Sequence, residues 1–233
     1  MVLFVQTLFI QVFKKEDRSI HRPQTKSRRS RSKYTKFKFN LDLEKFGTTR
    51  LEDDVVAMIK KRVVDMAGCL GEGMTVRLNY SEVELSGTRN GRHKNVPTPT
   101  APFKGYCRLY LESVDNELMF TTIQDSWEVC LSIREGNFEQ VSFVNSIATI
   151  NGGSHVTHIT NQIMDHLVRV LSEKNNNANL QANDVKNCLW VFVNALIDNP
   201  KFDADDLGQT YLNEPDNFES QYKLPDQFLE KGM

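Results

Sequence analysis

The chain has 233 residues, of which 39% are hydrophobic, so its size suits one domain with tails or at most two small domains. Its net charge of −1 is unevenly spread: residues 1–35 carry nine Lys and Arg against two acidic residues, whereas residues 198–233 carry nine acidic residues against three lysines. The apolar start, residues 1–13, is too short to span a bilayer and has no positive charge before it, so neither a membrane span nor a secretory leader is expected.

A basic segment follows this apolar start. Residues 18–33 (RSIHRPQTKSRRSRSK) are nearly free of apolar side chains, so they are expected to be disordered. Two readings stay open: a solvated arm, or a segment that binds nucleic acid or an acidic partner or carries a nuclear address. Residues 34–43 then alternate apolar and polar side chains, which predicts a strand.

The next segment has the spacing of an amphipathic helix. Within residues 51–71, apolar side chains recur every three or four positions, and acidic residues precede basic ones, which complements the helix dipole. The apolar positions are Val55, Ile59, Val63 and Met66. Residues 74–78 alternate again and predict a strand, whereas residues 86–102, rich in Gly, Pro, Thr and Asn, predict a loop.

Together with these elements, the second half of the chain predicts one sheet for the whole chain with helices packed on it, an α+β or two-layer α/β fold. Residues 103–111 have the spacing of a short helix. Residues 127–133 and 140–149 read as two strands that pair as a hairpin. Residues 156–174 predict a helix of about five turns, and the continuous apolar run at 189–197 predicts a central strand buried on both faces.

Reactive side chains form no recognisable site. The four cysteines lack any CxxC pair and have apolar neighbours, so we expect buried thiols in a reducing compartment. They are Cys69, Cys107, Cys130 and Cys188. His155, His158 and His166 fall near one helix start, but no other ligand at suitable spacing completes a metal set, so structural roles are expected. No catalytic residue and no metal site is predicted.

Two glycine-containing segments resemble phosphate loops. Residues 87–94 (GTRNGRHK) do not open a helix and are followed by three prolines, so a solvent loop is expected. Gly152 and Gly153 precede a helix, so their amides could bind an anion. A tight turn with positive φ explains both glycines equally well.

Several long segments nonetheless strongly resemble consecutive parts of the eukaryotic type II DNA topoisomerases. They are YTKFKFNLDLEKF, LEDDVVAMIKKRVVDMAGCLG, WEVCLSI, VSFVNSIATINGG and LWVFVNALIDNP, in the order and spacing of that family. The resemblance covers about residues 23–233, with a divergent gap at 80–102 and a loose tail after 203. Runs such as VSFVNSIATINGG are not generic core patterns, so the resemblance is specific.

The resemblance implies a transducer, the domain between the nucleotide-binding fold and the DNA gate. It implies a fold like domain 2 of ribosomal protein S5, a mixed sheet with helices on one side. The implied organisation is a basic arm (1–33), a strand remnant from the end of the ATPase domain (34–50), the transducer (51–200) and an acidic tail (201–233). On this reading the chain is a fragment, since the ATP-binding motifs would precede it and the DNA-cleaving tyrosine and metal cluster would follow it.

The family's transducer contributes one nucleotide contact, a lysine in a Gln-Thr-Lys loop just after the NPxFD segment. Here Gln209 and Thr210 match the first two positions, but a tyrosine follows them. Counting directly from the NPKFD segment gives Asp205, Asp206 and Leu207 instead. Under either alignment the lysine is missing, and two carboxylates would repel a triphosphate, so poor ATP sensing is expected.

The family also has a lysine-rich turn after the long helix that touches DNA. The corresponding contacts here are Lys174, Asn175 and Asn176, while Glu173, Asn176 and Gln181 stand where lysines are usual. Fewer cationic contacts to phosphates lower DNA affinity and flatten its salt dependence, so weak DNA binding by the folded part is expected.

The implied partners are DNA and a second copy or a full-length topoisomerase II subunit, in the nucleus and without a membrane. The intact family uses ATP and Mg²⁺, but no cofactor is expected for this chain alone, which lacks the nucleotide-binding boxes and the breakage tyrosine. Two alternatives stay open: a free-standing, non-catalytic module that interacts with DNA or a topoisomerase, and a complete small ATPase.

Overall fold

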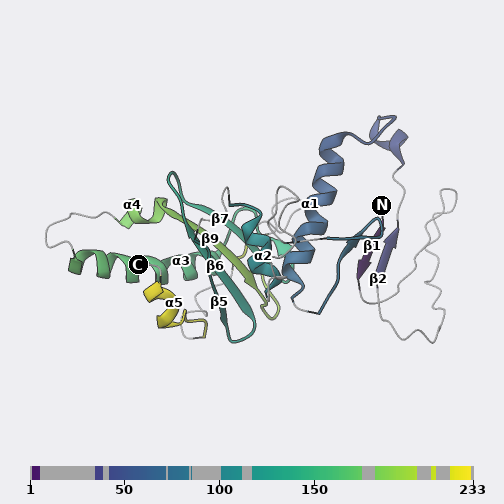
Figure 1. Cartoon of the computed structure of the whole chain (residues 1–233). Helices are drawn as coiled ribbons and strands as arrows, with labels where there is room; N and C mark the ends of the chain where they lie inside the picture. Colours follow the sequence, from purple (N-terminus) through teal and green to yellow (C-terminus); the bar gives the residue numbers. More distant parts are fainter. Residues whose placement is uncertain are drawn as a thin grey trace. The chain divides into compact units, whose positions relative to one another are not determined.

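The computed structural model describes residues 2–5, 35–38, 42–71, 73–83, 85, 101–111, 117–174, 182–203, 211–213 and 221–231. The chain divides into two compact units, an N-terminal unit, Met1–Leu85, and a C-terminal unit, Ser86–Met233. Figure 1 shows the elements of both. Among the described helices, none is long and apolar enough to cross a membrane.

The N-terminal unit contains a small antiparallel sheet with the strand order β2-β1-β3-β4. Its strands are β1 (Val2–Val5), β2 (Thr35–Lys38), β3 (Arg77–Leu78) and β4 (Ser81–Glu82). The two strands predicted around residues 35 and 77 are therefore present but shorter. The apolar start of the chain forms strand β1, which was not predicted, because residues 1–33 were expected to be an unstructured arm.

The helix of the N-terminal unit, α1 (Asp53–Cys69), confirms the amphipathic spacing. It follows a 3₁₀ turn, η1 (Leu43–Phe46), and begins with two acidic residues. The Asp65 side chain of α1 is buried, and the ammonium of Lys61, one helical turn earlier, lies 3.0 Å from the Asp65 carboxylate. A buried carboxylate needs such a partner, because desolvating an unpaired charge is costly.

The C-terminal unit is built on a mixed five-stranded sheet with the order β5-β6-β9-β7-β8. Its strands are β5 (Met119–Ile123), β6 (Trp127–Ile133), β7 (Glu139–Val144), β8 (Ile147–Ala148) and β9 (Leu189–Ala195). The β7 and β9 strands are parallel, and the other neighbours are antiparallel. The predicted fold class, a mixed sheet with helices, is confirmed. The prediction that one sheet holds all the strands is wrong, because the strands around residues 35 and 77 belong to the separate sheet of the N-terminal unit.

The predicted hairpin between β6 and β7 is wrong. Strand β9 lies between them, antiparallel to β6 and parallel to β7. The reason is burial: six of the seven β9 residues are buried and the seventh, Trp190, is partly buried, so the strand needs neighbours on both edges and cover on both faces. Its central position was predicted, but its two neighbours were not.

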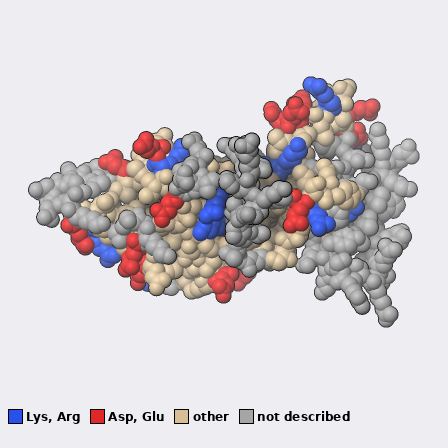
Figure 2. Space-filling view, viewed as in Figure 1, with Lys and Arg blue, Asp and Glu red and all other residues tan. Residues whose placement is uncertain are grey.

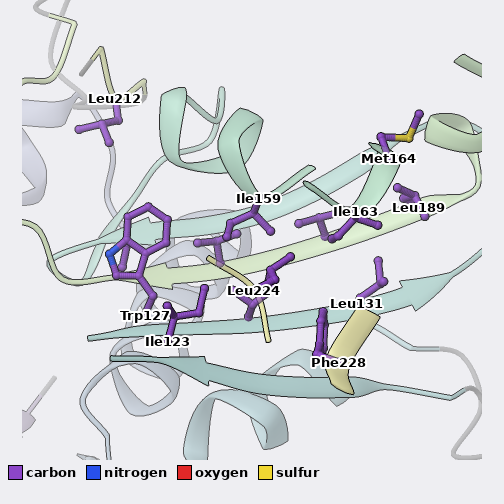
Figure 3. Close-up of a cluster of buried hydrophobic side chains, with 14 of the residues drawn as sticks. Ile123, Trp127, Leu131, Ile159, Ile163, Met164, Leu189, Leu212, Leu224 and Phe228 are labelled. Carbon is purple, nitrogen blue, oxygen red and sulfur yellow. The ribbon is translucent and has the colours of Figure 1, made fainter. Parts of the chain in front are cut away.

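Helices cover both faces of this sheet, whereas the resemblance implied helices on one side alone. On one face, α3 (Ser154–Lys174) and α5 (Asp226–Lys231) pack on a continuous apolar core, in which Ile159, Ile163 and Phe228 are buried (Figure 3). On the other face, α2 (Pro102–Arg108) places Tyr106 edge-to-face against Phe143, with ring centroids 5.6 Å apart. The remaining helix, α4 (Ala182–Asn187), leads into β9.

All four cysteines are free. Cys69, Cys107 and Cys130 are buried as expected, but Cys188 is exposed, because it sits in the turn between α4 and β9. The expectations for residues 18–33 and for the loop segment 87–94 fall outside the described residues.

Candidate functional site

The C-terminal unit pairs the backbones of residues 201–203 and 211–213. Phe202 and Leu212 form an antiparallel bridge. The Asp203 amide donates to the Tyr211 carbonyl at 3.0 Å, and the Asn213 amide donates to the Lys201 carbonyl at 2.9 Å. The residues on either side of the segment 204–210 are therefore held together by paired backbone; we call residues 203–211 the loop, and its base is this pairing.

The same Leu212 is joined to the start of α3. Its amide donates to the Gly152 carbonyl at 3.1 Å, and its carbonyl accepts from the Ser154 amide at 3.0 Å. Gly153 lies between those two residues and forms a parallel bridge with Leu212. We call this arrangement of residues 152–154 with Leu212 the Leu212 clasp.

Glycine is required at the centre of the Leu212 clasp. Gly153 has φ +147°, in the region that side chains rarely adopt. A Cβ atom there would lie 2.5 Å from the Leu212 carbonyl oxygen and 2.6 Å from its nitrogen. The clasp therefore depends on the close approach of two backbones, and the Leu212 side chain itself is fully buried.

The hydrogen bonds at the start of α3 decide between the two readings of the glycine pair. The Gly152 amide donates to the Thr149 carbonyl, and the Ser154 amide donates to Leu212. The amides of Val156 and Thr157 both donate to the Gly153 carbonyl. These four amides donate to protein carbonyls, and both glycines have positive φ, which favours the tight turn over a phosphate site.

Polar side chains from β7 and α3 form a hydrogen-bonded network next to this turn. The Thr149 hydroxyl lies 3.1 Å from His155 Nε2 and also contacts the Ser142 hydroxyl. Gln140 donates from its side-chain amide to the carbonyls of Thr149, at 3.2 Å, and Ile150, at 2.8 Å. The network connects strand β7 to the first turn of α3.

His155 is fully buried in this network, and its Nδ1 has no hydrogen-bond partner among the described residues. Burial lowers the pKa of His155 to about 3, because it removes the water that would solvate the charged imidazolium. The side chain is therefore neutral at physiological pH and serves the fold.

The three histidines near the start of α3 do not converge on one point. His155 pairs with Thr149, His158 Nε2 lies 2.7 Å from the Tyr222 carbonyl oxygen, and His166 Nδ1 lies 3.2 Å from the Arg169 guanidinium. No group of three metal-binding side chains occurs anywhere in the described ranges. Their structural assignment from sequence is consistent with these separate partners.

The residues predicted to contact ligands lie at or beyond the edges of the described structure. Gln209 and Thr210 belong to the loop that the clasp closes but fall outside the described residues, as do Asn175 and Asn176. Lys174 is the last residue of α3. Their roles therefore remain predictions.

Sequence reasoning missed the clasp. Gly153 and Leu212 are 59 positions apart, and nothing in the sequence near Leu212 indicates its partner. The only local signal was the glycine pair itself, which indicated a special backbone conformation without showing what approaches it.

Comparisons with known proteins agree with this architecture. The family model described as DNA gyrase B matches residues 102–221, more than half of the chain. DNA topoisomerase 2 of Arabidopsis thaliana is 45% identical over 205 residues, which cover 85% of this chain and 13% of that protein. The chain belongs to the DNA gyrase B family and, within it, to the eukaryotic type II DNA topoisomerases.

Two solved structures locate the matching region. The ATPase and transducer domains of DNA topoisomerase II from Balamuthia mandrillaris superpose with a TM-score of 0.74 at 31% identity, covering 99% of this chain and 57% of that one. The ATPase region of Saccharomyces cerevisiae topoisomerase II gives 0.72 at 29% identity, covering 100% and 57%. The chain thus corresponds to part of the ATPase and transducer region, and to a small share of the full-length relatives.

Proposed function

We propose that this chain is the transducer part of an ATP-dependent type II DNA topoisomerase, coupling the state of the nucleotide to the DNA gate. The observation that supports this most directly is the Leu212 clasp. It fastens the base of loop 203–211, where the family places its nucleotide-contacting lysine, to the first turn of the longest helix.

Helix α3 is suited to carry a displacement between two sites. Its 21 residues span about 30 Å. The clasp lies at one end, and Lys174, the predicted DNA contact, lies at the other. One face of the helix packs on the sheet core along most of this length, so a movement of the loop base would shift the helix as a unit.

The described residues do not fit a nucleotide site of their own. The Ser154, Val156 and Thr157 amides at the start of α3 donate to protein carbonyls, and Asp203 is exposed. ATP and Mg²⁺ would accordingly be held by other parts of the enzyme. With Leu207, Asp205 and Asp206 in place of the family's loop residues, this version responds weakly to ATP.

The partners follow from the family. We propose that the chain acts in the nucleus, in a homodimer or with a full-length topoisomerase II subunit, and that it touches DNA weakly. Lys and Arg are interspersed with Asp and Glu on the described surface seen in Figure 2, where no broad area of positive charge appears. Such a surface gives little of the phosphate attraction that dominates DNA affinity.

A segment exchange tests the proposal. Residues 34–231 would replace the corresponding segment of the Arabidopsis relative, and ATP-dependent relaxation of supercoiled plasmid would be measured. We expect an assembled enzyme with impaired ATP-dependent relaxation, and a gain of activity when the lysine is restored by Tyr211→Lys or by Leu207→Lys, one variant for each alignment. Relaxation by the isolated chain, or a chimera that assembles but is unaffected by both substitutions, would contradict the proposal.

A second candidate function rests on the basic segment. Residues 18–33 contain seven Lys and Arg and no acidic residue, which favours a non-catalytic module that binds DNA through this segment. A gel shift at several salt concentrations, with and without residues 1–33, tests it. Binding that disappears with the segment supports the module; binding that persists unchanged assigns DNA contact to the folded part.

A further inference from the structure

The last described segment, residues 221–231, lies along α3 and ends in α5. We call it the strap. Two of its side chains, Leu224 and Phe228, are buried in the core that α3 forms with the sheet (Figure 3). The Tyr222 ring stacks on the fully buried Trp127 ring at a centroid distance of 4.4 Å. The strap is thus anchored by apolar contact at three positions.

Two polar side chains on α3 hold the strap's backbone. His158 Nε2 lies 2.7 Å from the Tyr222 carbonyl oxygen, and Gln162 Nε2 donates to the same oxygen at 3.1 Å. Gln162 Oε1 accepts from the Leu224 amide at 2.9 Å. One glutamine side chain therefore offers a donor and an acceptor to backbone groups two residues apart, as a neighbouring strand would.

These contacts lie immediately after the Leu212 clasp on the same helix. Ser154, which holds Leu212 by its amide, is one turn before His158 and two turns before Gln162. Leu212 and Leu224 both belong to the core cluster that contains the fully buried Ile159. A densely packed core transmits displacement between such neighbours, because it contains little free volume to absorb it.

We infer that the strap is a latch, held by His158 and Gln162, whose seating is coupled to the base of loop 203–211 through the first three turns of α3. Release of the strap loosens the Leu212 clasp, and loosening the clasp unseats the strap. The coupling must be reciprocal, because it is a property of one equilibrium between two seated segments. It does not depend on the proposed function or on any nucleotide.

Hydrogen exchange of the whole chain, read by mass spectrometry, tests the coupling. Gln162→Ala removes both backbone contacts, and we expect exchange of residues 221–231 to rise about tenfold, as expected for lost hydrogen bonds to buried groups. Exchange at the Leu212 and Ser154 amides should rise severalfold in the same variant. Asn161→Ala, at an exposed position on the same helix, serves as the matched control and should change neither.

The reciprocal variant is Leu212→Val, which changes no residue of the strap and neither of the side chains that hydrogen-bond to it. It should raise exchange in the strap severalfold. A strap that exchanges faster in Gln162→Ala while Leu212 and Ser154 stay protected would overturn the coupling. Unchanged hydrogen exchange of the strap in Gln162→Ala would overturn the latch itself.

Two further measurements keep the test decisive if Gln162→Ala folds poorly. Gln162→Glu retains the acceptor for Leu224 and removes the donor to Tyr222, so an intermediate rise in exchange is expected. In a Trp190→Phe background Trp127 is the remaining tryptophan, because the chain contains two. Its emission should shift to the red when the strap leaves the ring, and an unshifted emission in a variant with fast strap exchange would contradict the assignment of Tyr222 as an anchor.

Discussion

The two ends of α3 are stabilised in different ways. At its start, the helix is fixed by backbone pairing with Leu212 and by the buried His155, both without exposure to solvent. Towards its end, exposed charged residues such as Arg169 and Glu173 alternate with partly buried apolar ones. The first end therefore tolerates almost no change, whereas the second end can change its charge at little cost to the fold.

This difference has a functional reading. A coupling helix needs one end that is mechanically fixed to the part that moves and another whose surface can adapt to a ligand. The exposed end is where this chain is predicted to depart from the lysine-rich pattern of its family, and substitutions there should cost little stability, because surface substitutions rarely cost more than about 0.5 kcal/mol. The predictions below test each end separately.

The largest effect is expected from Gly153→Ala. The added Cβ would clash with the Leu212 backbone and stand at an unfavourable φ, so we expect the free energy of unfolding to fall by about 4 kcal/mol. Urea unfolding measures it. Gly136→Ala is a matched control, because Gly136 also has positive φ (+131°) but its nearest neighbour is a flexible arginine side chain at 3.9 Å. Equal losses in both variants would mean that Leu212 contact does not matter.

Leu212→Ala should follow, with a loss of about 3 kcal/mol, because it leaves a cavity at a fully buried position. Leu196→Ala, at a side chain that is 53% exposed, should change the unfolding free energy by well under 1 kcal/mol. Thermal or urea unfolding of both variants provides the comparison. A small effect at Leu212 would show that the clasp is not part of the cooperative core.

His155 should make the fixed end sensitive to acid. Its pKa is lowered to about 3 in the folded protein, whereas the unfolded chain takes up the proton near the ordinary value of 6.5. The contribution of the neutral His155 ring to the free energy of unfolding is complete above about pH 6.5. Below that pH it falls by up to about 1.4 kcal/mol per pH unit until about pH 3. His155→Gln should flatten this slope in urea unfolding at several pH values, whereas His166→Gln should retain it.

The smallest effect on the fold is expected at the exposed end of α3. Glu173→Lys together with Gln181→Lys restores two of the family's cationic positions. The free energy of unfolding should change by less than about 1 kcal/mol. DNA binding should tighten, and the slope of the logarithm of affinity against the logarithm of salt concentration should steepen by about one for each added lysine. Fluorescence anisotropy with duplex DNA at several salt concentrations measures this. An unchanged slope would show that the turn after α3 does not contact DNA.

Much of the fold follows from periodicity in the sequence. The spacing of apolar residues predicted α1 and α3, and the continuous apolar run predicted β9 as a central strand. Short or polar elements were missed: β5, α4 and α5 have too few residues for a periodic pattern to stand out. The order of strands was also missed, because a hairpin and a parallel crossover can share the same local pattern.

The sequence by itself determined which of the longer segments form helices and strands and which family they resemble, because both depend on residue identity and local spacing. Only the tertiary structure decided that β9 lies between β6 and β7, that Leu212 closes on Gly153, and that His158 and Gln162 hold the strap. These contacts join residues more than 50 positions apart. They arise from filling one common core, which no local pattern specifies.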